Sequence, residues 1–327
     1  MNYTSKGRFP SVSKVVGVRH AVLAGVLGVL LSTVALAVQG EMSRAFPIDT
    51  IQQPPTFSVQ EPSTVSAGFF FSCGVALDSS ISCWGSNSHG QTVPPAGSFS
   101  EITTGSLHAC AITTNKTIKC WGGDSNGQGA APEGSFAKVD AGALHTCALR
   151  TDQTLACWGS NDTGQSNPPS GTFVSIATGH SHSCAVGLNQ LISCWGYNNE
   201  GQSSPPAGLF TSVTAGYEHS CALSTTGAIT CWGNDRWGQS SPPTGSFSSV
   251  SAGDFHTCAT RSDQSIACWG SQAWDATTPP AGTFQSVSSG HTHTCARNSD
   301  RSVSCWGRNN FGQTMPPSAP FTVTQTG

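Results

Sequence analysis

Charged residues are scarce in this chain, making up only 9% of its 327 residues. Because amphipathic helices need a charged face, so low a content argues against a helical bundle. The 14 Lys and Arg are outnumbered by 17 Asp and Glu, and without clustered basic residues the chain is not suited to binding nucleic acid. Glycine and proline are abundant instead, with 37 and 19 residues. This composition is typical of short strands and tight turns, so we expect an all-β fold.

The first 40 residues differ in kind from the rest. An N-terminal region with four basic residues precedes the uncharged apolar run 21–38. Ala35-Leu36-Ala37 has the small-x-small pattern of a signal cleavage site. These features are typical of a secretory signal peptide, residues 1–37. The run is also just long enough to span a bilayer, so an uncleaved signal anchor, with membrane contact, is the alternative. Either way we expect the rest to be secreted or extracytoplasmic. Cleavage would leave ten basic against seventeen acidic residues, a net charge of −7.

No cysteine lies outside seven pairs that recur with a fixed period. The two members of a pair are 10 residues apart, and successive pairs are 37 residues apart. The pairs are Cys73 and Cys83, Cys110 and Cys120, Cys147 and Cys157, Cys184 and Cys194, Cys221 and Cys231, Cys258 and Cys268, and Cys295 and Cys305. Such a repeat is typical of an array or propeller, and paired cysteines with none left over predict a disulfide framework. The spacing fits a bridge across one hairpin, although pairing between units stays open.

One unit, residues 210–246, shows the pattern of all seven. Segments 210–214, 219–223 and 228–232 are separated by glycine and polar residues, which predicts three short strands. Pro242-Pro243 cannot donate hydrogen bonds to a β-ladder and marks the exit to the next unit. After a linker at 38–61 we expect one domain at 62–327. Its units lie at about 62–98, 99–135, 136–172, 173–209, 210–246, 247–283 and 284–320.

Tryptophan and histidine recur with the cysteines. A tryptophan follows every second cysteine, and we expect it to pack between neighbouring units. A histidine stands two positions before the first cysteine in six units, at His108, His145, His182, His219, His256 and His293, with Phe71 in the first. These histidines could form a ring that binds metal, or they could be buried and fix a strand to the next unit by a hydrogen bond. One imidazole per unit of a wide ring would not converge on an ion, so we expect no metal site.

The pattern V-x-A-G-x-x-H-x-C-A…C-W-G-x-N-x-x-G-Q recurs over residues 65–313. It resembles the repeat of the regulator of chromosome condensation family. The resemblance implies a seven-bladed β-propeller, with 37-residue blades of three to four short strands, that acts as a binding scaffold without catalysis or a cofactor. With its short period and paired cysteines the chain is more similar to secreted relatives, the bacterial seven-bladed β-lactamase inhibitory protein and the plant crinkly-repeat ectodomains. Nuclear members are nucleotide exchange factors for a small GTPase, a role that export and the charge of −7 argue against.

The chain continues the pattern beyond its seventh unit. Phe321 stands 37 residues after Phe284, whereas the first unit has Pro62 in place of the phenylalanine that opens a strand. We therefore expect a C-terminal strand at 321–325 to complete the first blade and close the ring. Closure removes open edges, while an open solenoid would need polar caps, which the sequence lacks.

Positions that differ between units are the candidates for binding. The residue before Gly-Gln is aromatic only in the last three units, at Trp237, Trp274 and Phe311, although Asp275-Ala276 replaces Gly-Gln in the sixth. Equivalent positions share a rim, so we expect an aromatic arc, with Tyr197, Arg236 and Arg308 in the same loops. Such residues anchor protein interfaces; the alternative is that the rings only fill gaps between loops and blades. A second variable position, held by Phe69, Ser106, Ala143, His180, Tyr217, Asp254 and His291, shows no usable trend.

No local motif places a nucleophile beside a base, so we expect no catalytic residues and no enzyme. The leading hypothesis is an exported binding scaffold that engages a protein partner of unknown identity through one rim. The first alternative is a carbohydrate-binding propeller, in which the aromatic arc stacks on sugar rings. The second is an enzyme with its site at the mouth of the channel.

Overall fold

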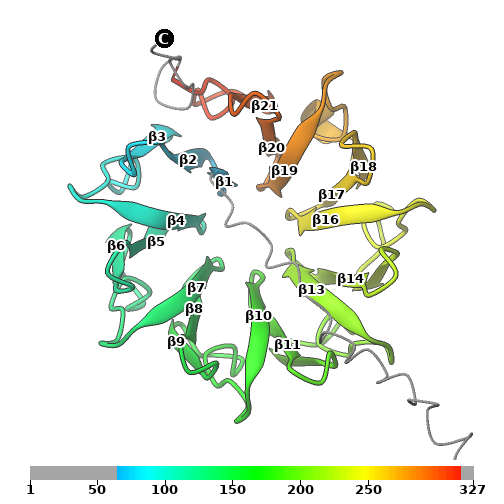
Figure 1. The fold of residues 1–327 in the computed structure, drawn as a ribbon, viewed down its shortest axis with the longest axis horizontal. Helices are drawn as coiled ribbons and strands as arrows, with labels where there is room; N and C mark the ends of the chain where they lie inside the picture. The colour runs from blue at the N-terminus through cyan, green and yellow to red at the C-terminus, as the bar shows by residue number, and fades with distance from the viewer. Residues whose placement is uncertain (1–64, 318–327) are drawn as a thin grey trace, which may run out of the picture. The chain divides into compact units, whose positions relative to one another are not determined.

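Seven three-stranded antiparallel sheets form a ring in the computed structural model, which describes residues 65–317 (Figure 1). Each sheet is made by one 37-residue repeat, so the predicted all-β, seven-bladed propeller is confirmed, with three strands in each blade. The expected signal peptide or anchor (1–37), linker (38–61) and closing strand (321–325) lie outside the described residues. No helix of residues 65–317 is long and apolar enough to cross a membrane.

The strands follow the repeats in order. The first three sheets hold β1 (Val65–Ala67), β2 (Phe71–Val75), β3 (Ile81–Gly85), β4 (Phe99–Thr104), β5 (His108–Thr113), β6 (Ile118–Gly122), β7 (Phe136–Ala141), β8 (His145–Arg150) and β9 (Leu155–Gly159). The next two hold β10 (Phe173–Thr178), β11 (His182–Gly187), β12 (Ile192–Gly196), β13 (Phe210–Ala215), β14 (His219–Ser224) and β15 (Ile229–Gly233). The last two hold β16 (Phe247–Ala252), β17 (His256–Arg261), β18 (Ile266–Gly270), β19 (Phe284–Ser289), β20 (His293–Asn298) and β21 (Val303–Gly307), and a short 3₁₀ helix, η1 (Ala273–Asp275), follows β18.

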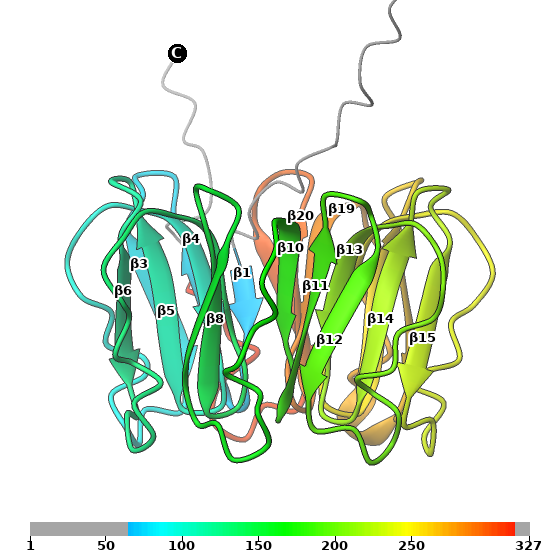
Figure 2. The same ribbon diagram turned by 90° about the horizontal axis from the view of Figure 1, so that it is seen from below.

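The first strand of each sheet lies nearest the centre of the ring (Figure 1). Because the three strands of a blade alternate in direction, the ring has two different rims (Figure 2). We call the loop rim the edge that carries the turn after each first strand and the loop after each third strand. The opposite edge, the hairpin rim, carries the turns between second and third strands. Backbone hydrogen bonds such as Asn234 N to Glu218 O, 2.8 Å, join a turn and a loop on the loop rim.

Apolar side chains fill the space between adjacent blades. In one such cluster, Val186 of β11 packs with Phe210 and Val213 of β13, and Trp232 of β15 covers them. The tryptophans therefore pack between units, as expected. Each indole Nε1 also donates to a backbone carbonyl of the preceding repeat, as Trp232 does to Gln202 O at 2.8 Å. Burial of such large apolar surfaces is the main stabilising term for joining one blade to the next.

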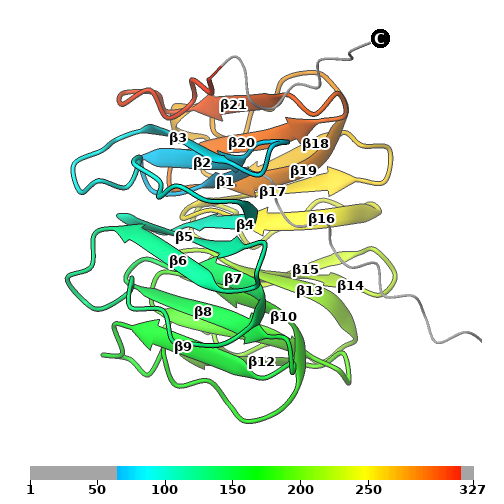
Figure 3. The same cartoon turned by 60° about the vertical axis from the view of Figure 1, so that its left-hand side comes forward.

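The six repeated histidines are buried and bind the next blade. Five Nε2 atoms lie 2.8–2.9 Å from hydroxyls 38 residues further on, in the pairs His108–Thr146, His145–Ser183, His182–Ser220, His219–Thr257 and His256–Thr294. The sixth, His293 Nε2, lies 2.7 Å from Ser72 Oγ and joins the two ends of the ring. This arrangement is the hydrogen-bonding role predicted from sequence. The ring also closes through Trp84 Nε1, which donates to Gln313 O at 2.9 Å. The first and last sheets accordingly lie side by side (Figure 3).

All fourteen cysteines form disulfides within hairpins, each between the second and third strands of one blade. The two members face each other directly in the strand register, as Cys147 and Cys157 do. The first member of each pair is fully buried. Every outer hairpin is thus closed covalently, and the question of pairing within or between blades is resolved in favour of the hairpin.

Candidate functional site

A cleft of about 710 Å³ opens on the loop rim among the last three repeats. Its lining includes Trp237, Phe255, Trp274, His291, Thr292 and Arg308. The two tryptophans are large apolar side chains left 56% and 52% exposed. A volume of this size is ordinary for a binding pocket, and exposed aromatic groups beside it are unusual on a monomer without a partner.

Arg308 is held between two aromatic rings at this cleft. Its guanidinium carbon lies 4.8 Å from the centre of the Trp274 ring and 5.0 Å from that of Phe70. Phe70 in turn lies 5.2 Å from Phe311. Cation–π contacts of this kind orient the guanidinium group. The arginine therefore links the cleft to the aromatic surface of the first and seventh repeats.

The loop that carries Trp274 departs from the repeat. In the fifth repeat Gly238 adopts a φ of 80°, and the Gln239 side chain accepts a hydrogen bond from Trp237 N. In the sixth repeat Trp274 and Asp275 have φ of 64° and 57°. A bulky residue in the left-handed region is strained by about 1–2 kcal/mol, and such strain is concentrated at functional sites. The altered loop places Trp274 over Arg308.

The structure brings together only part of the predicted arc. Trp237, Trp274 and Arg308 line one cleft, and the half-exposed Phe311 is connected to them through Phe70. Tyr197 and Arg236 lie in loops of the same rim but do not line the cleft. The hydroxyl of Tyr197 accepts a hydrogen bond from Asn199 Nδ2. A role for these six residues in binding stays a prediction.

A second set of rings lies along part of the channel mouth, from the fourth repeat round to the first, and the sequence interpretation missed it. The contacts run from His180 to Tyr217 (4.2 Å between centres), to Phe255 (5.5 Å), to His291 (5.6 Å) and to Phe69 (3.8 Å). We call these five residues, together with Phe70, the aromatic collar. Four members, Phe69, His180, Tyr217 and His291, share one position of the turn after the first strand, whereas Phe70 and Phe255 hold the next position. In the sixth repeat the first of these positions is Asp254, which interrupts the series when that position is searched alone. A joint search of both positions would have found the collar.

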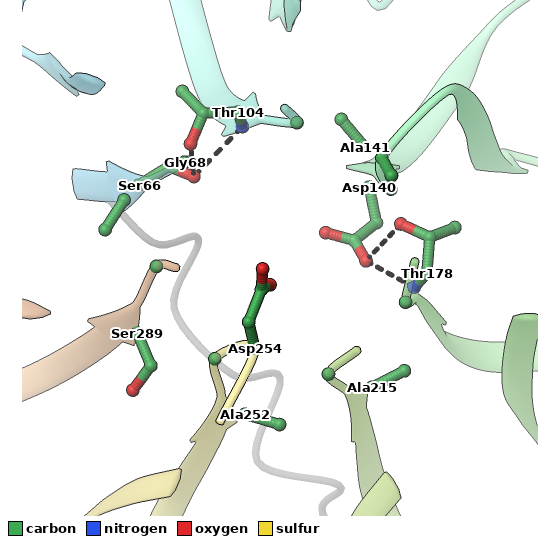
Figure 4. A pocket seen from close by; sticks show the side chains of 18 of the residues that line it. Ser66, Gly68, Thr104, Asp140, Ala141, Thr178, Ala215, Ala252, Asp254 and Ser289 are labelled. Carbon is green, nitrogen blue, oxygen red and sulfur yellow. Dashed lines mark hydrogen bonds between the residues drawn. The ribbon is translucent and has the colours of Figure 1, made fainter. Parts of the chain in front are cut away.

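The centre of the ring is a polar channel, lined by residues that include Asp140, Thr178 and Asp254 (Figure 4). Side-chain oxygens at one position of the inner strands accept backbone N–H groups of the next blade, at Ser66, Thr103, Asp140, Thr214, Ser251 and Ser288. Burial raises the pKa of Asp140 to about 6, against the opposing hydrogen bonds from Thr178 N–H and hydroxyl. Burial also raises the pKa of Glu101, deeper in the channel, to about 7. In residues 65–317 no three His, Cys, Asp or Glu side chains are grouped so that they could hold a metal ion.

The Ser–His pairs between blades have the composition of a nucleophile and its base, but their hydrogen bonds point the other way. Ser183 Oγ donates to Gln165 O at 3.1 Å, so the proton in its contact with His145 comes from the imidazole Nε2. Burial lowers the pKa of His145 to about 3. Both side chains are fully buried. The pair therefore joins blades, because a base must accept the proton of its nucleophile and the pair must be reachable by substrate.

Solved structures with the same ring include two plant receptor ectodomains and a yeast protein. The Crinkly WD40 ectodomain of the Arabidopsis thaliana receptor kinase ACR4 is 25% identical, with a TM-score of 0.64 over 75% of this chain and 97% of that chain. The entire ectodomain of the Physcomitrella patens receptor kinase CR4 is 26% identical, with a TM-score of 0.66 over 75% and 73%. Prp20p from Saccharomyces cerevisiae is 14% identical, with a TM-score of 0.62 over 76% and 83%, and shows similarity of fold alone.

No curated protein matches the sequence. A family model, however, matches all seven blades. The model is that of the regulator of chromosome condensation (RCC1) repeat, and it matches residues 63–91, 99–128, 136–165, 173–202, 210–239, 247–273 and 284–313. Since these matches span more than half of the chain, the protein belongs to the regulator of chromosome condensation (RCC1) repeat family.

Proposed function

We propose that this protein is an exported, non-catalytic scaffold that binds another protein through its loop rim. The observation that carries the proposal is the asymmetric distribution of aromatic residues on that rim. Rings occupy the turns and loops of the fourth to seventh and first repeats, whereas the second and third carry Ser106, Ala143, Asn126 and Thr163 at the same two positions. Large rings with adjacent arginine are typical of the centre of a protein interface.

Export is supported by the chemistry of the repeats and by two relatives. Seven disulfides in one chain are stable in an oxidising compartment and would be reduced in most cytosols. The two plant relatives, at 25% and 26% identity, are ectodomains of receptor kinases. The basic, apolar and small-residue features of the N-terminus agree with export.

The test compares the two rims of the full chain. One variant carries Trp237→Ser, Trp274→Ser and Phe311→Ser on the loop rim. The matched control carries Leu188→Ser, Leu191→Ser and Leu209→Ser, which remove side chains of similar exposure, 45–53%, from the hairpin rim. Each immobilised protein is incubated with the extracellular fraction of its native culture, and retained proteins are quantified by mass spectrometry.

We expect the native chain and the hairpin-rim control to retain the same proteins, and the loop-rim variant to lose them. Equal retention by all three would refute the assignment to the loop rim. A glycan array provides the second arm. Strong binding to a sugar that disappears on Trp237→Ala would replace the protein partner with a carbohydrate.

A further inference from the structure

We propose that the cleft between Trp237 and Trp274 receives an acidic side chain of the partner, Asp or Glu, with Arg308 as its counter-ion. This inference rests on the proposed function and specifies the chemistry of the partner's anchor. The occupant is a carboxylate next to an apolar residue, because the cleft combines an unpaired cation with aromatic walls.

Arg308 has no anionic partner among residues 65–317. The ion pair present in residues 65–317 joins His291 to Asp254, so the Asp254 carboxylate beside the collar is already engaged. The Arg308 side chain makes no hydrogen bond, and its Nε is buried without an acceptor. Its contacts are the faces of Phe70 and Trp274, which fix the plane of the guanidinium and leave its N–H edge for a ligand. A carboxylate is the group that matches such an edge with two parallel hydrogen bonds.

A second unpaired polar atom lies in the same cleft. Thr292 Oγ1 is buried and has no hydrogen-bond partner. Thr292 and Arg308 are held together by the backbone, because Arg308 N donates to Thr292 O at 2.9 Å. Buried polar groups without partners are rare in folded proteins and destabilise them. Thr292 Oγ1 and Arg308 Nε are both closed to solvent, so a ligand carboxylate would pair with the terminal N–H groups of the guanidinium.

The rest of the cleft favours an apolar neighbour for this carboxylate. A volume of about 710 Å³ exceeds the size of one carboxylate, and the additional lining includes Trp237, Trp274 and Phe255. These rings would bury the side chain adjacent to the acid and exclude water from the ion pair, which strengthens it. A basic partner is disfavoured because it would place a second cation beside an unpaired arginine.

Selection from a library of random dodecapeptides displayed on phage, with the full chain as bait, tests the proposal. We expect the recovered peptides to share Asp or Glu next to an aromatic or aliphatic residue. For the strongest synthetic peptide, replacement of the acid by its amide should weaken binding at least 10-fold, and Arg308→Gln should do the same. The double change should weaken it little further, because both single changes remove one contact.

Arg236→Gln is the matched control, since Arg236 lies in the loop of the fifth repeat on the same rim but outside the cleft. It should change the affinity less than 2-fold, and an unfolding curve for each variant confirms that the protein is folded. The carboxylate anchor is wrong if the selection returns no peptide or only peptides without acids, or if Arg308→Gln binds as well as the native chain. Loss of peptide binding in the triple loop-rim variant but not in Arg308→Gln would leave the proposed function standing without this anchor. Binding of sialyl or glucuronyl glycans that depends on Arg308 would overturn both in favour of an acidic sugar.

Discussion

Acid should unfold this ring steeply, because six buried histidines take up protons when it opens. Burial lowers the pKa of His108 and His256 to about 4, and that of the other four to about 3, from an ordinary value of 6.5. For a base whose pKa is lower in the folded state, the unfolded chain binds more protons. This contribution to stability is therefore fully present above pH 6.5 and is lost as the pH falls from 6.5 toward the folded-state pKa values of about 4 and 3.

The size of the effect follows from the number of protons. At pH 5 nearly all six histidines are neutral in the folded ring and charged in the unfolded chain. Glu101 and Asp140 act in the opposite direction, since burial raises their pKa values to about 7 and 6 and they release protons on unfolding at this pH. The net uptake is on the order of four protons, which corresponds to about 5 kcal/mol of unfolding free energy per pH unit. The total unfolding free energy of a domain is about 5–15 kcal/mol, so the loss over one pH unit is a large part of it.

The chain itself contains an apolar equivalent of the histidine–hydroxyl contact between blades. Phe71 replaces the histidine in the first repeat, and the hydroxyl position that it faces in the next blade is Ala109. The double variant His182→Phe, Ser220→Ala places the same apolar pair between the fourth and fifth blades, where His182 now contacts Ser220. Gln202 O keeps the hydrogen bond from Trp232 Nε1, so no carbonyl is left without a donor. We expect a folded protein whose stability depends on pH by about 1.4 kcal/mol per unit less than that of the native chain.

The measurement is urea unfolding without reductant, followed by tryptophan fluorescence and repeated at half-unit steps from pH 7 to 5. It gives the change of unfolding free energy with pH for the native chain and for the double variant. A native chain whose unfolding free energy stays flat over this range would refute the burial of neutral imidazoles. An unchanged slope in the double variant would show that His182 does not contribute to it.

Three further changes should alter stability in predictable directions, each measured by chemical denaturation. Replacement of Cys147 and Cys157 by Ser should lower the unfolding free energy by about 3 kcal/mol, because it opens a short closed loop; a loss near zero would contradict a covalent contribution. Ala177→Ser should raise it by about 1 kcal/mol, since position 177 alone among its seven equivalents offers no side-chain oxygen to the next blade, here to Ala215 N–H; destabilisation would mean that the oxygen is buried without that contact. Asp275→Gly should raise it by at most about 1 kcal/mol through relief of its positive φ, and a drop would show that the aspartate side chain supports the loop.

The fold was predictable because every repeated residue has one structural task that the spacing exposes. The 37-residue period gives the number of blades, and the contacts between histidine and hydroxyl recur at a spacing of 38. Even the exception is visible in the sequence, since Phe71 and Ala109 change together at that spacing. Disulfide pairing within hairpins follows from the short separation of the cysteines, but only the strand register excludes pairing between blades.

The candidate site was less predictable, because it depends on positions where the repeat gives no template. The aromatic collar draws on two adjacent positions, and in the sixth repeat Phe255 stands one position after Asp254, which interrupts the series in a comparison of one position. Arg308 could be assigned to the right rim, but its contacts with Phe70 come from the first repeat, 238 residues earlier in the chain. The conformation of Trp274 cannot be inferred from the equivalent residues of the other repeats, because the sixth repeat has Asp275-Ala276 in place of Gly-Gln.

The sixth repeat shows how such a loop can change without opening the ring. Ala276 replaces the glutamine, yet its backbone carbonyl still accepts hydrogen bonds from Trp306 Nε1 at 2.9 Å and from Thr294 Oγ1 at 3.2 Å. The contact between the sixth and seventh repeats therefore depends on a main-chain carbonyl, which any residue supplies. The strain of about 1–2 kcal/mol at Trp274 is confined to the loop rim. Since the histidine, tryptophan and disulfide contacts of this blade are unaffected, the loop rim can carry different side chains from repeat to repeat at little expense to the ring.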